Sequence, residues 1–368
     1  MDTHPADLTI GFPRESGTER RTILTPGLAR ALIRAGFDVI AEPGIGSGTF
    51  IGDEEYAAAG VRLTEPGRVW SAPLLLRYKS PDPGDLRYLR PEQHIAALFH
   101  AEGDAGLLTA LQECGATAWS YEFVIEHGRF PLGRPGGQIA GIQAILAGVH
   151  ALQAPAGRGV LLAAVDGAAK ANVVVIGSGN VGAAAAETAA MLGANVTVLT
   201  HGEPSRADYL RRAPGGVQVL VNTRETLLEC LANADLVIGA ILVSTYDTPP
   251  MISEADLAVM RPGAVIVDAT CGYGPGYLPA AGPVQAPGDP PHQVAGVLHV
   301  KVDVFPALVP VTATTAYVAN ATPYLERLAR TALLGIPDTA IEAARIACAG
   351  HLVHPVLIQH ARIYGLQP

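Results

Sequence analysis

Three glycines at fixed spacing predict a nucleotide site in the middle of the chain. The G-x-G-x-x-G motif of residues 177–182 follows an apolar run, residues 173–176, and precedes an alanine-rich helical stretch. In this setting the first glycine permits a tight turn, the second lets the backbone approach a pyrophosphate, and the third allows close helix–strand packing. The helix N-terminus then offers N–H groups and a positive dipole to the anion. The predicted site comprises Gly177, Ser178, Gly179, Asn180, Val181 and Gly182.

The end of the following strand bears on which dinucleotide is bound. An Asp or Glu there usually holds the ribose 2′-hydroxyl of NAD, but this chain has Thr200, followed by His201. No carboxylate stands at the strand end to repel a 2′-phosphate, and Thr200, Ser205 and Arg206 could hydrogen-bond one. The sequence therefore favours NADP(H) over NAD(H). Glu203 could still reach the ribose, which keeps NAD(H) open, and Arg206 could instead be a solvated loop charge.

Three further residues could carry chemistry because each stands just beyond an apolar run. Arg21 lies in the polar loop after the run 8–12, Lys79 ends another run, and His100 ends a third. An arginine can bind a carboxylate in bidentate fashion, a lysine can polarise a carbonyl, and a histidine is the usual acid or base near neutral pH. Beside a nicotinamide, these side chains would serve hydride transfer at a carbon bearing N or O. The alternatives are a surface charge for Arg21 or Lys79 and a helix cap for His100.

The elements that must position these residues alternate between strands and helices, which is typical of a parallel sheet. In the first part we expect strands at residues 8–12, 37–41, 61–63, 74–77, 95–99 and 117–120, and helices at 26–35, 54–59 and 106–114. Further on we expect strands at 173–176, 195–199, 235–243, 264–268 and 300–309, and helices at 139–152, 253–260 and 314–334.

The order of these elements predicts two domains. A proline–glycine cluster at residues 133–138 marks a boundary, and residues 272–293 form a long irregular loop. The last long helix is expected to kink or restart at Pro323, and the remaining C-terminal part is expected to be helical. We predict an α/β protein with two Rossmann-like domains. The dinucleotide-binding domain, 137–302, is inserted into a discontinuous catalytic domain of residues 1–136 plus 303–368.

Composition excludes several other classes of protein. The chain has 368 residues, 49% of them hydrophobic, yet no apolar run is long enough to span a bilayer and the N-terminus lacks a signal-peptide pattern. The four cysteines are scattered, which favours free thiols in the cytoplasm and argues against a zinc site. The histidine group 351–360 lacks carboxylate partners, so no metal site is expected. A net charge of −9 without a basic cluster argues against nucleic acid.

Several stretches, taken together and in order, resemble a known superfamily. IGFPRESGTERRTILTP, LLLRYKSP, ALFHAEGD, SYEFV, GQIAGIQAI, VVVIGSGNVG, ADLVIGAILV and RPGAVIVDAT are similar to stretches of alanine dehydrogenases, transhydrogenase α-type domains and saccharopine dehydrogenases. The resemblance implies an inserted Rossmann domain and a homo-oligomer, a dimer or a hexamer. It also implies that Arg21 binds the substrate carboxylate, that Lys79 binds substrate and takes part in catalysis, and that His100 is the catalytic histidine. The segment beside the nicotinamide would be Ala240, Ile241 and Leu242.

The chain departs from alanine dehydrogenases at two places. Their catalytic aspartate, in a V-A-I-D-Q-G stretch, corresponds to Gly272, and the asparagine of their V-A-N-M-P stretch corresponds to Val304. The stretch VDVFPALVP instead resembles saccharopine dehydrogenases, and its Asp303 either supplies a carboxylate to the substrate site or caps the return strand.

These observations leave three hypotheses. The first is an NAD(P)-dependent amino-acid dehydrogenase that interconverts an amino acid with a 2-oxo acid and ammonia, with a substrate larger than alanine or differently charged. The second is an opine-type or saccharopine-type enzyme that reduces a secondary imine. The third is a dinucleotide-binding protein without catalysis.

Overall fold

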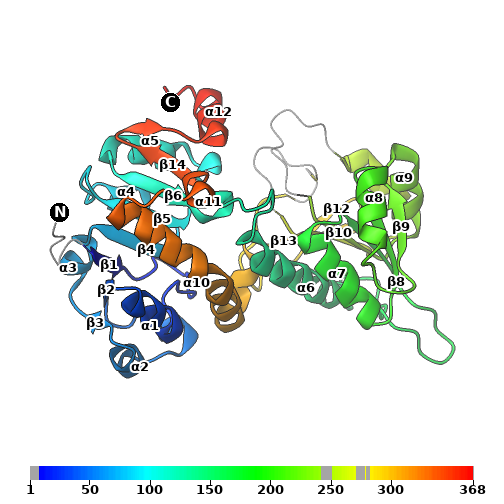
Figure 1. Ribbon diagram of the computed structural model, residues 1–368. Helices are drawn as coiled ribbons and strands as arrows, with labels where there is room; N and C mark the ends of the chain where they lie inside the picture. Colours follow the sequence, from blue (N-terminus) through cyan, green and yellow to red (C-terminus); the bar gives the residue numbers. More distant parts are fainter. Residues whose placement is uncertain (1–7, 242–250, 271–277, 279–281, 368) are drawn as a thin grey trace. The chain divides into compact units, whose positions relative to one another are not determined.

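The chain forms two compact units, which we describe separately (Figure 1). This computed structural model describes residues 8–241, 251–270, 278 and 282–367. Unit 1 comprises Met1–Pro135 and Val309–Pro368, and unit 2 comprises Gly136–Leu308. The predicted α/β class, with one Rossmann-like domain inserted into the sequence of another, is confirmed.

The borders of the two units differ from those predicted. Residues 303–308 lie in unit 2, because the 3₁₀-helix η7 (Phe305–Leu308) buries Phe305 in the core of that unit. The first border lies between residues 135 and 136, inside helix α6 (Gly133–Ala151). The proline–glycine cluster 133–138, predicted to mark a boundary, contains this border and forms the first turns of α6, which begins six residues before the predicted helix 139–152. A proline is tolerated there because the first turn of a helix has no internal partner for its N–H.

Unit 1 is built on an eight-stranded sheet in which the first six strands of the chain are all parallel. Across the sheet the order is β15 (His351–Leu352), β14 (Arg345–Cys348), β6 (Thr117–Ser120), β5 (His94–Leu98), β4 (Leu74–Lys79), β1 (Thr9–Phe12), β2 (Asp38–Ala41) and β3 (Arg62–Leu63). The helices are α1 (Pro26–Arg34), α2 (Asp53–Ala58), α3 (Pro66–Trp70), α4 (Pro83–Leu86), α5 (Ala105–Cys114), α10 (Pro310–Leu334), α11 (Thr339–Glu342) and α12 (Pro355–Ile363). Short 3₁₀-helices lie at η2 (Ser47–Thr49), η3 (Ala101–Gly103) and η4 (Tyr121–Phe123).

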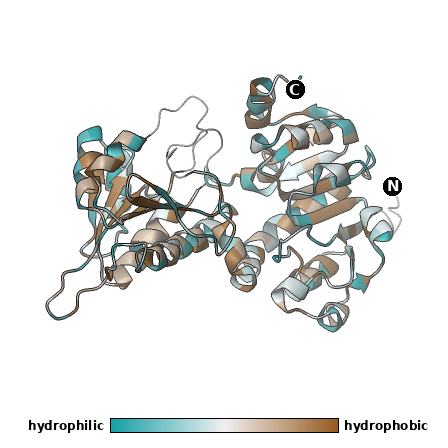
Figure 2. Cartoon of the chain, turned by 180° about the vertical axis from the view of Figure 1, so that it is seen from behind, coloured by the Kyte–Doolittle hydropathy of each residue, from teal (hydrophilic) through white to brown (hydrophobic). Residues whose placement is uncertain are grey.

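Both faces of this sheet are buried, as the hydrophobic colouring of its strands in Figure 2 indicates. Alternate side chains of β4 point to opposite faces: Leu74 and Leu76 pack in the core that includes α1 and α10, whereas Leu75 packs in the core that includes α5 and α12. This explains why the strands read as continuous apolar runs.

The structure of the C-terminal part differs from two predictions. Residues 345–352 form the antiparallel strands β14 and β15, not helix, because β14 pairs with the free edge of β6. Helix α10 continues through Pro323 without a restart. Its buried residues on both sides of the proline, among them Tyr317 and Leu325, pack into one core, and that packing holds the two halves in register.

Unit 2 contains a seven-stranded sheet that is parallel apart from one edge strand. Its order is β12 (His292–Val294), β13 (Val297–Lys301), β11 (Val265–Asp268), β10 (Leu236–Gly239), β7 (Asn172–Ile176), β8 (Asn195–Thr200) and β9 (Gln218–Val221). Its helices are α6, α7 (Asn180–Met191), α8 (Glu203–Leu210) and α9 (Arg224–Asn233). The predicted helix 253–260 is the 3₁₀-helix η5 (Glu254–Val259), which Ser253 and Asp256 cap reciprocally. The strand predicted at 235–243 ends at Gly239; residues 242 and 243 lie outside the described part.

Helices α6 and α7 cover one face of the unit 2 sheet at close range. A side chain at Gly141 would meet the carbonyl oxygen of Val181 at 2.2 Å, so glycine is required for this approach. Within the described residues, no helix is long and apolar enough to cross a membrane, and no group of three or more His, Cys, Asp or Glu side chains could hold a metal ion.

Candidate active site

The candidate residues of unit 1 lie where neighbouring parallel strands end. Strands β1, β4, β5 and β6 are consecutive in the sheet, and the carboxyl ends of parallel strands meet at one edge. Arg21 follows β1, Lys79 is the last residue of β4, and His100 lies two residues beyond β5. The fold therefore brings these three predicted residues to the same edge.

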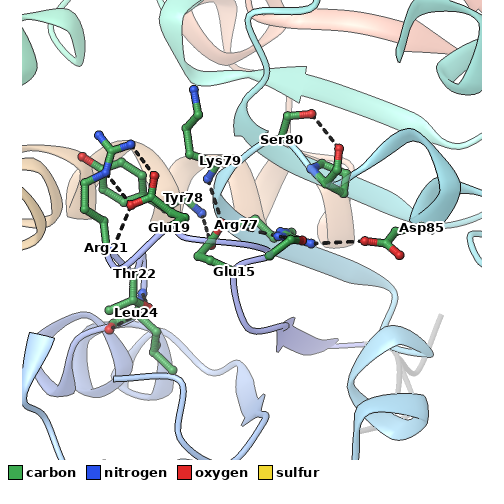
Figure 3. Close-up of polar contacts among 12 residues, drawn as sticks. Glu15, Glu19, Arg21, Thr22, Leu24, Arg77, Tyr78, Lys79, Ser80 and Asp85 are labelled. Atoms are coloured by element: carbon green, nitrogen blue, oxygen red, sulfur yellow. Dashed lines mark hydrogen bonds and ion pairs between the residues drawn. The ribbon is translucent and has the colours of Figure 1, made fainter. Parts of the chain in front are cut away.

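Arg21 is buried and held on two sides (Figure 3). Its Nε donates to Glu19 Oε1 at 2.7 Å and its Nη2 donates to Glu19 Oε2 at 2.5 Å. Its guanidinium lies over the ring of Tyr78, 4.5 Å from the centroid. Burial raises the pKa of Tyr78 to about 12, which keeps the hydroxyl protonated near neutral pH. One edge and one face of the guanidinium are thus occupied. A ligand can bind only to the N–H donors that Glu19 does not already engage.

The carboxylate of Glu19 stays ionised although it is largely buried. Burial by itself would raise the pKa of Glu19, but the hydrogen bonds from Arg21 outweigh it and lower that pKa. The charge of Lys79 acts in the same direction. Arg21, Glu19 and Lys79 therefore form one electrostatic group, in which the carboxylate lies beside both cations.

A second carboxylate, Glu15, ties the loop after β1 to the end of β4 (Figure 3). It accepts hydrogen bonds from the backbone N–H of Tyr78 at 2.7 Å and of Lys79 at 3.1 Å. The buried Arg77 lies 3.4 Å from it. Burial raises the pKa of Glu15, and Arg77 opposes that change. The brace fixes the backbone from which Lys79 projects.

His100 has a left-handed backbone, with φ 46° and ψ 38°. Its N–H donates to Glu122 Oε1 at 2.7 Å, and the same oxygen lies 3.8 Å from its Nδ1. Glu122 belongs to η4, directly after β6. The ring of His100 is 44% exposed, so a ligand can reach it.

The glycine turn of unit 2 fits a dinucleotide. Gly177 has φ 109°, and a side chain there would lie 2.5 Å from the carbonyl oxygen of Ala240. A side chain at Gly182 would lie 2.0 Å from the oxygen of Gly177, whereas the space beside Gly179 is open. Helix α7 begins at Asn180 with no side-chain cap on its first turn. The turn thus has the open backbone approach and the N–H groups that a pyrophosphate needs.

The residues beyond β8 make other contacts than those predicted. Thr200 is buried and its hydroxyl donates to Leu220 O at 3.2 Å. Arg206 donates to Val219 O at 3.0 Å and to Glu203 Oε2 at 3.2 Å, and His201 is exposed. The preference for NADP(H) depended on the missing carboxylate at the strand end and on Thr200, Ser205 and Arg206 binding a 2′-phosphate. Since Thr200 and Arg206 bond within the protein, the structure does not support that preference.

The segment predicted to lie beside the nicotinamide is partly described. Ala240 and Ile241 follow β10, and the Ile241 carbonyl accepts a hydrogen bond from Thr270 at 2.9 Å. Asp268 and Lys301 are paired across β11 and β13, with 3.9 Å between Oδ2 and Nζ. The predicted residues Leu242 and Gly272 lie outside the described residues.

Asp303 lies in an exposed turn of unit 2.

Five residues that contact these sites were missed from the sequence. Four of them lie near a predicted residue, either along the chain or at the end of an adjacent strand, so position alone gave a weak signal. Arg212, whose guanidinium donates to Ser178 O at 2.9 Å, gave none. The five are Glu15, Glu19, Tyr78, Glu122 and Arg212.

Comparison with protein families identifies the relatives of this chain. The model for Alanine dehydrogenase/PNT, N-terminal domain, matches residues 11–140, and that for Alanine dehydrogenase/PNT, C-terminal domain, matches residues 144–355. The chain belongs to the alanine dehydrogenase/PNT family. An alanine dehydrogenase of Bacillus subtilis is 33% identical over 94% of this chain and 93% of its own length. One of Halomonas elongata is 35% identical over 88% of each.

Solved structures of this family have the same fold. An L-alanine dehydrogenase superposes with a TM-score of 0.87 at 31% identity, over 96% of this chain and 99% of that one. A transhydrogenase from Sinorhizobium meliloti superposes with a TM-score of 0.77 at 21% identity, over 94% and 99%, and shares the fold. The family resemblance of the sequence is thus confirmed, and the chain is an alanine dehydrogenase-like oxidoreductase with a Rossmann nucleotide-binding domain.

Proposed function

We propose that the protein is an amino-acid dehydrogenase that uses a nicotinamide dinucleotide. A hydride passes from Cα of an L-amino acid to the oxidised nicotinamide, and water hydrolyses the resulting imine to the 2-oxo acid and ammonia; the reverse reaction consumes the 2-oxo acid, ammonia and the reduced nicotinamide. The main support is the grouping of Arg21, Lys79 and His100 at one sheet edge in a chain that matches alanine dehydrogenases over nearly its whole length. The glycine turn of unit 2 supplies the nucleotide site.

Each residue has a distinct role in this reaction. Arg21, held by Glu19 and Tyr78, pairs with the substrate carboxylate through its remaining donors. Lys79 binds the substrate oxygen or nitrogen at the reacting carbon, and His100 moves the proton as that carbon changes its bond to nitrogen. The bound nicotinamide accepts or supplies the hydride. The fixed guanidinium limits the entropy lost on binding.

The substrate differs from alanine in size or charge. Position 272 carries glycine and position 304 carries valine, where alanine dehydrogenases carry an aspartate and an asparagine. Asp303 lies in an exposed turn, and its role is structural, at the end of the return strand. The saccharopine-like stretch 302–310 is the observation that favours the alternative, reduction of a secondary imine.

The nucleotide is NAD(H) and not NADP(H). Glu203 neutralises Arg206 within hydrogen-bond distance, so the end of β8 carries no net positive charge from this pair for a 2′-phosphate. The same carboxylate is 71% exposed and is the nearest acidic group along the chain to the predicted ribose position. The protein is also a homo-oligomer.

The test is nucleotide oxidation by the purified protein. NADH and NADPH are each titrated, and their oxidation is followed with a panel of short, long and dicarboxylic 2-oxo acids, with and without ammonia. Turnover that requires ammonia is expected, and the panel identifies the side chain. The Lys79→Ala and His100→Ala variants should lose turnover, whereas Lys170→Ala, which changes an exposed lysine, should keep it.

Other outcomes point elsewhere. Turnover only with a second amino acid and no ammonia supports the imine-reducing alternative. Nucleotide binding without oxidation across the panel contradicts catalysis and supports a dinucleotide-binding protein. Absence of binding contradicts the site at residues 177–182.

A further inference from the structure

The backbone of His100 is strained, so neighbouring groups must stabilise its conformation. A left-handed conformation costs a non-glycine residue about 1 kcal/mol or more and persists where neighbouring groups enforce it. The residues on either side are fixed: Phe99 N–H donates to Ser120 Oγ at 3.3 Å, and Gly103 N–H closes η3 onto His100 O at 3.3 Å. The N–H of His100 itself has Glu122 as its acceptor.

Glu122 touches both the backbone and the ring of His100. Its Oε1 accepts the N–H at 2.7 Å and lies 3.8 Å from Nδ1, somewhat beyond a hydrogen bond. Its Oε2 is buried and has no hydrogen-bond partner among the described residues. Such an orphan oxygen is costly. A small rotation of the carboxylate would let one oxygen keep the N–H while the other accepts Nδ1–H, and hydrogen bonds of this kind often tighten when substrate binds.

A second histidine near Glu122 is already engaged. His354 stacks on Phe123 with 3.9 Å between ring centroids, and its Nδ1 accepts the N–H of Val356 at the start of α12. Burial lowers the pKa of His354, and the charge of Glu122 only partly opposes this. His354 is therefore neutral near pH 7 and does not compete with His100 for the Glu122 carboxylate as a second cation.

We propose that Glu122 is the positioning residue for His100. It holds the left-handed backbone and directs Nδ1–H toward itself, which leaves Nε2 as the nitrogen that exchanges a proton with the substrate. A carboxylate on one ring nitrogen fixes the tautomer and stabilises the imidazolium. The role of Nε2 in proton exchange rests on the proposed function. The coupling of Glu122 to His100 rests on geometry alone.

Other ionisable groups also surround His100, and their effects on its ring must be distinguished from the effect of Glu122. They come from the elements packed around this turn and include Lys79, Glu102, Asp104, Tyr121, His354 and His360. Glu122 contacts both the N–H and the ring of His100. A change at Glu122 alone therefore distinguishes its contribution from that of the rest.

The experiment compares Glu122→Gln with the native protein. Glutamine keeps an oxygen for the His100 N–H but removes the charge and the second acceptor. We expect kcat to fall about tenfold or more with little change in KM, and the acid limb of the pH profile to move to lower pH. Glu113→Gln is the matched control, because Glu113 is exposed on α5 and the charge change is the same.

A second measurement does not depend on turnover. Imidazole signals of isotope-labelled protein are titrated by NMR, and the His100 signal is assigned by its loss in His100→Gln. In Glu122→Gln the titration midpoint of His100 should move down by about half a pH unit or more. Glu122→Asp, which keeps the charge on a shorter side chain, should restore more of the midpoint than of kcat.

The outcomes separate the two proposals. An unmoved His100 midpoint in both Glu122 variants overturns the inference, whatever the activity. A moved midpoint in a protein without dehydrogenase turnover supports the coupling and contradicts the proposed function. A kcat that falls equally in Glu113→Gln also overturns the positioning role.

Discussion

Arg21 illustrates how much a single residue depends on its fixed neighbours. Glu19 and Tyr78 hold its guanidinium before any ligand arrives. Lysine can keep the charge but cannot make a bidentate contact. The carboxylate of the substrate should be bound equally in the ground and transition states, so loss of this contact should appear in KM.

For Arg21→Lys we expect KM for the substrate to rise about tenfold, with a smaller change in kcat. Steady-state kinetics with the substrate found in the panel measure both values. Arg20→Lys is the control, because Arg20 is the adjacent residue and is exposed. Equal changes in the two variants would show that Arg21 does not bind the carboxylate.

The choice of nucleotide also depends on individual residues. Glu203 and Arg206 form an exposed ion pair, and such pairs are weak, on the order of 1 kcal/mol or less. In Glu203→Gln the guanidinium loses its partner and the carboxylate no longer repels a 2′-phosphate. We expect the ratio of kcat/KM for NADPH to that for NADH to rise about tenfold, while Glu225→Gln, an exposed change on α9, leaves it constant. An unchanged ratio would mean that Glu203 plays no part in selection.

At the scale of elements, the nucleotide turn depends on how closely two helices approach. In Gly141→Ala the added Cβ would lie 2.2 Å from Val181 O and 2.8 Å from Ala185 N, and both are backbone atoms that cannot move aside alone. We expect a loss of about 1–3 kcal/mol in the free energy of unfolding and weaker nucleotide binding, because the first turn of α7 must shift. Urea unfolding and nucleotide titration measure these effects.

Gly136→Ala is the matched control on the same helix. A Cβ there meets nothing within 4 Å, so alanine should leave stability equal or raise it by up to about 1 kcal/mol. If both variants bind nucleotide as the native protein does, the close approach of α6 and α7 does not support the site.

Strand β13 carries a buried histidine that links stability to pH. Burial lowers the pKa of His299 to about 4, and the nearby His292 adds to this. The unfolded chain takes up a proton near pH 6.5, whereas the folded chain does so only near pH 4. The stability that His299 contributes is therefore complete above about pH 6.5 and is lost as pH falls toward 4, by at most about 3 kcal/mol.

In His299→Leu this loss should disappear, so the difference in stability between pH 7 and pH 4 becomes smaller than in the native protein. Urea unfolding followed by circular dichroism measures it, with His351→Leu, an exposed change, as control. Both tryptophans, Trp70 and Trp119, belong to unit 1, so their fluorescence separately reports unfolding of unit 1, which does not contain His299. Equal pH dependence in the two variants would contradict the assignment to His299.

At the scale of the whole molecule, the predicted oligomer needs a surface. Ile142 and Leu146 are one turn apart on α6 and are 42% and 47% exposed. Charged residues in an apolar interface are costly. We expect Ile142→Glu with Leu146→Glu to lower the molar mass measured by light scattering, and Met191→Glu, an exposed apolar change on α7, to leave it unchanged. A native protein that is already monomeric would show the oligomer prediction to be wrong.

Local sequence patterns were sufficient to predict many of the strands of this protein and its glycine turn. Apolar runs gave most strands within a residue or two, and the spacing of residues 177–182, between a strand and a helix, gave the nucleotide turn. These features can be read from sequence because strand, tight turn and helix start depend on residues adjacent in the chain. The edge position of Lys79 and His100 also followed, since each ends an apolar run, and Arg21 lies in the polar loop after such a run.

Contacts between distant residues were decided only by the tertiary structure. Residues 345–352 are strands because β6 offered a free edge, and four residues are too short to show a period of their own. Glu15 braces Lys79 from 64 residues away, and Glu122 meets His100 across 22 residues because β5 and β6 are neighbours. Thr200 and Arg206 bond within unit 2 instead of facing a phosphate. Residue type and spacing thus fix which groups reach the edge of a sheet, whereas strand order fixes which groups meet there.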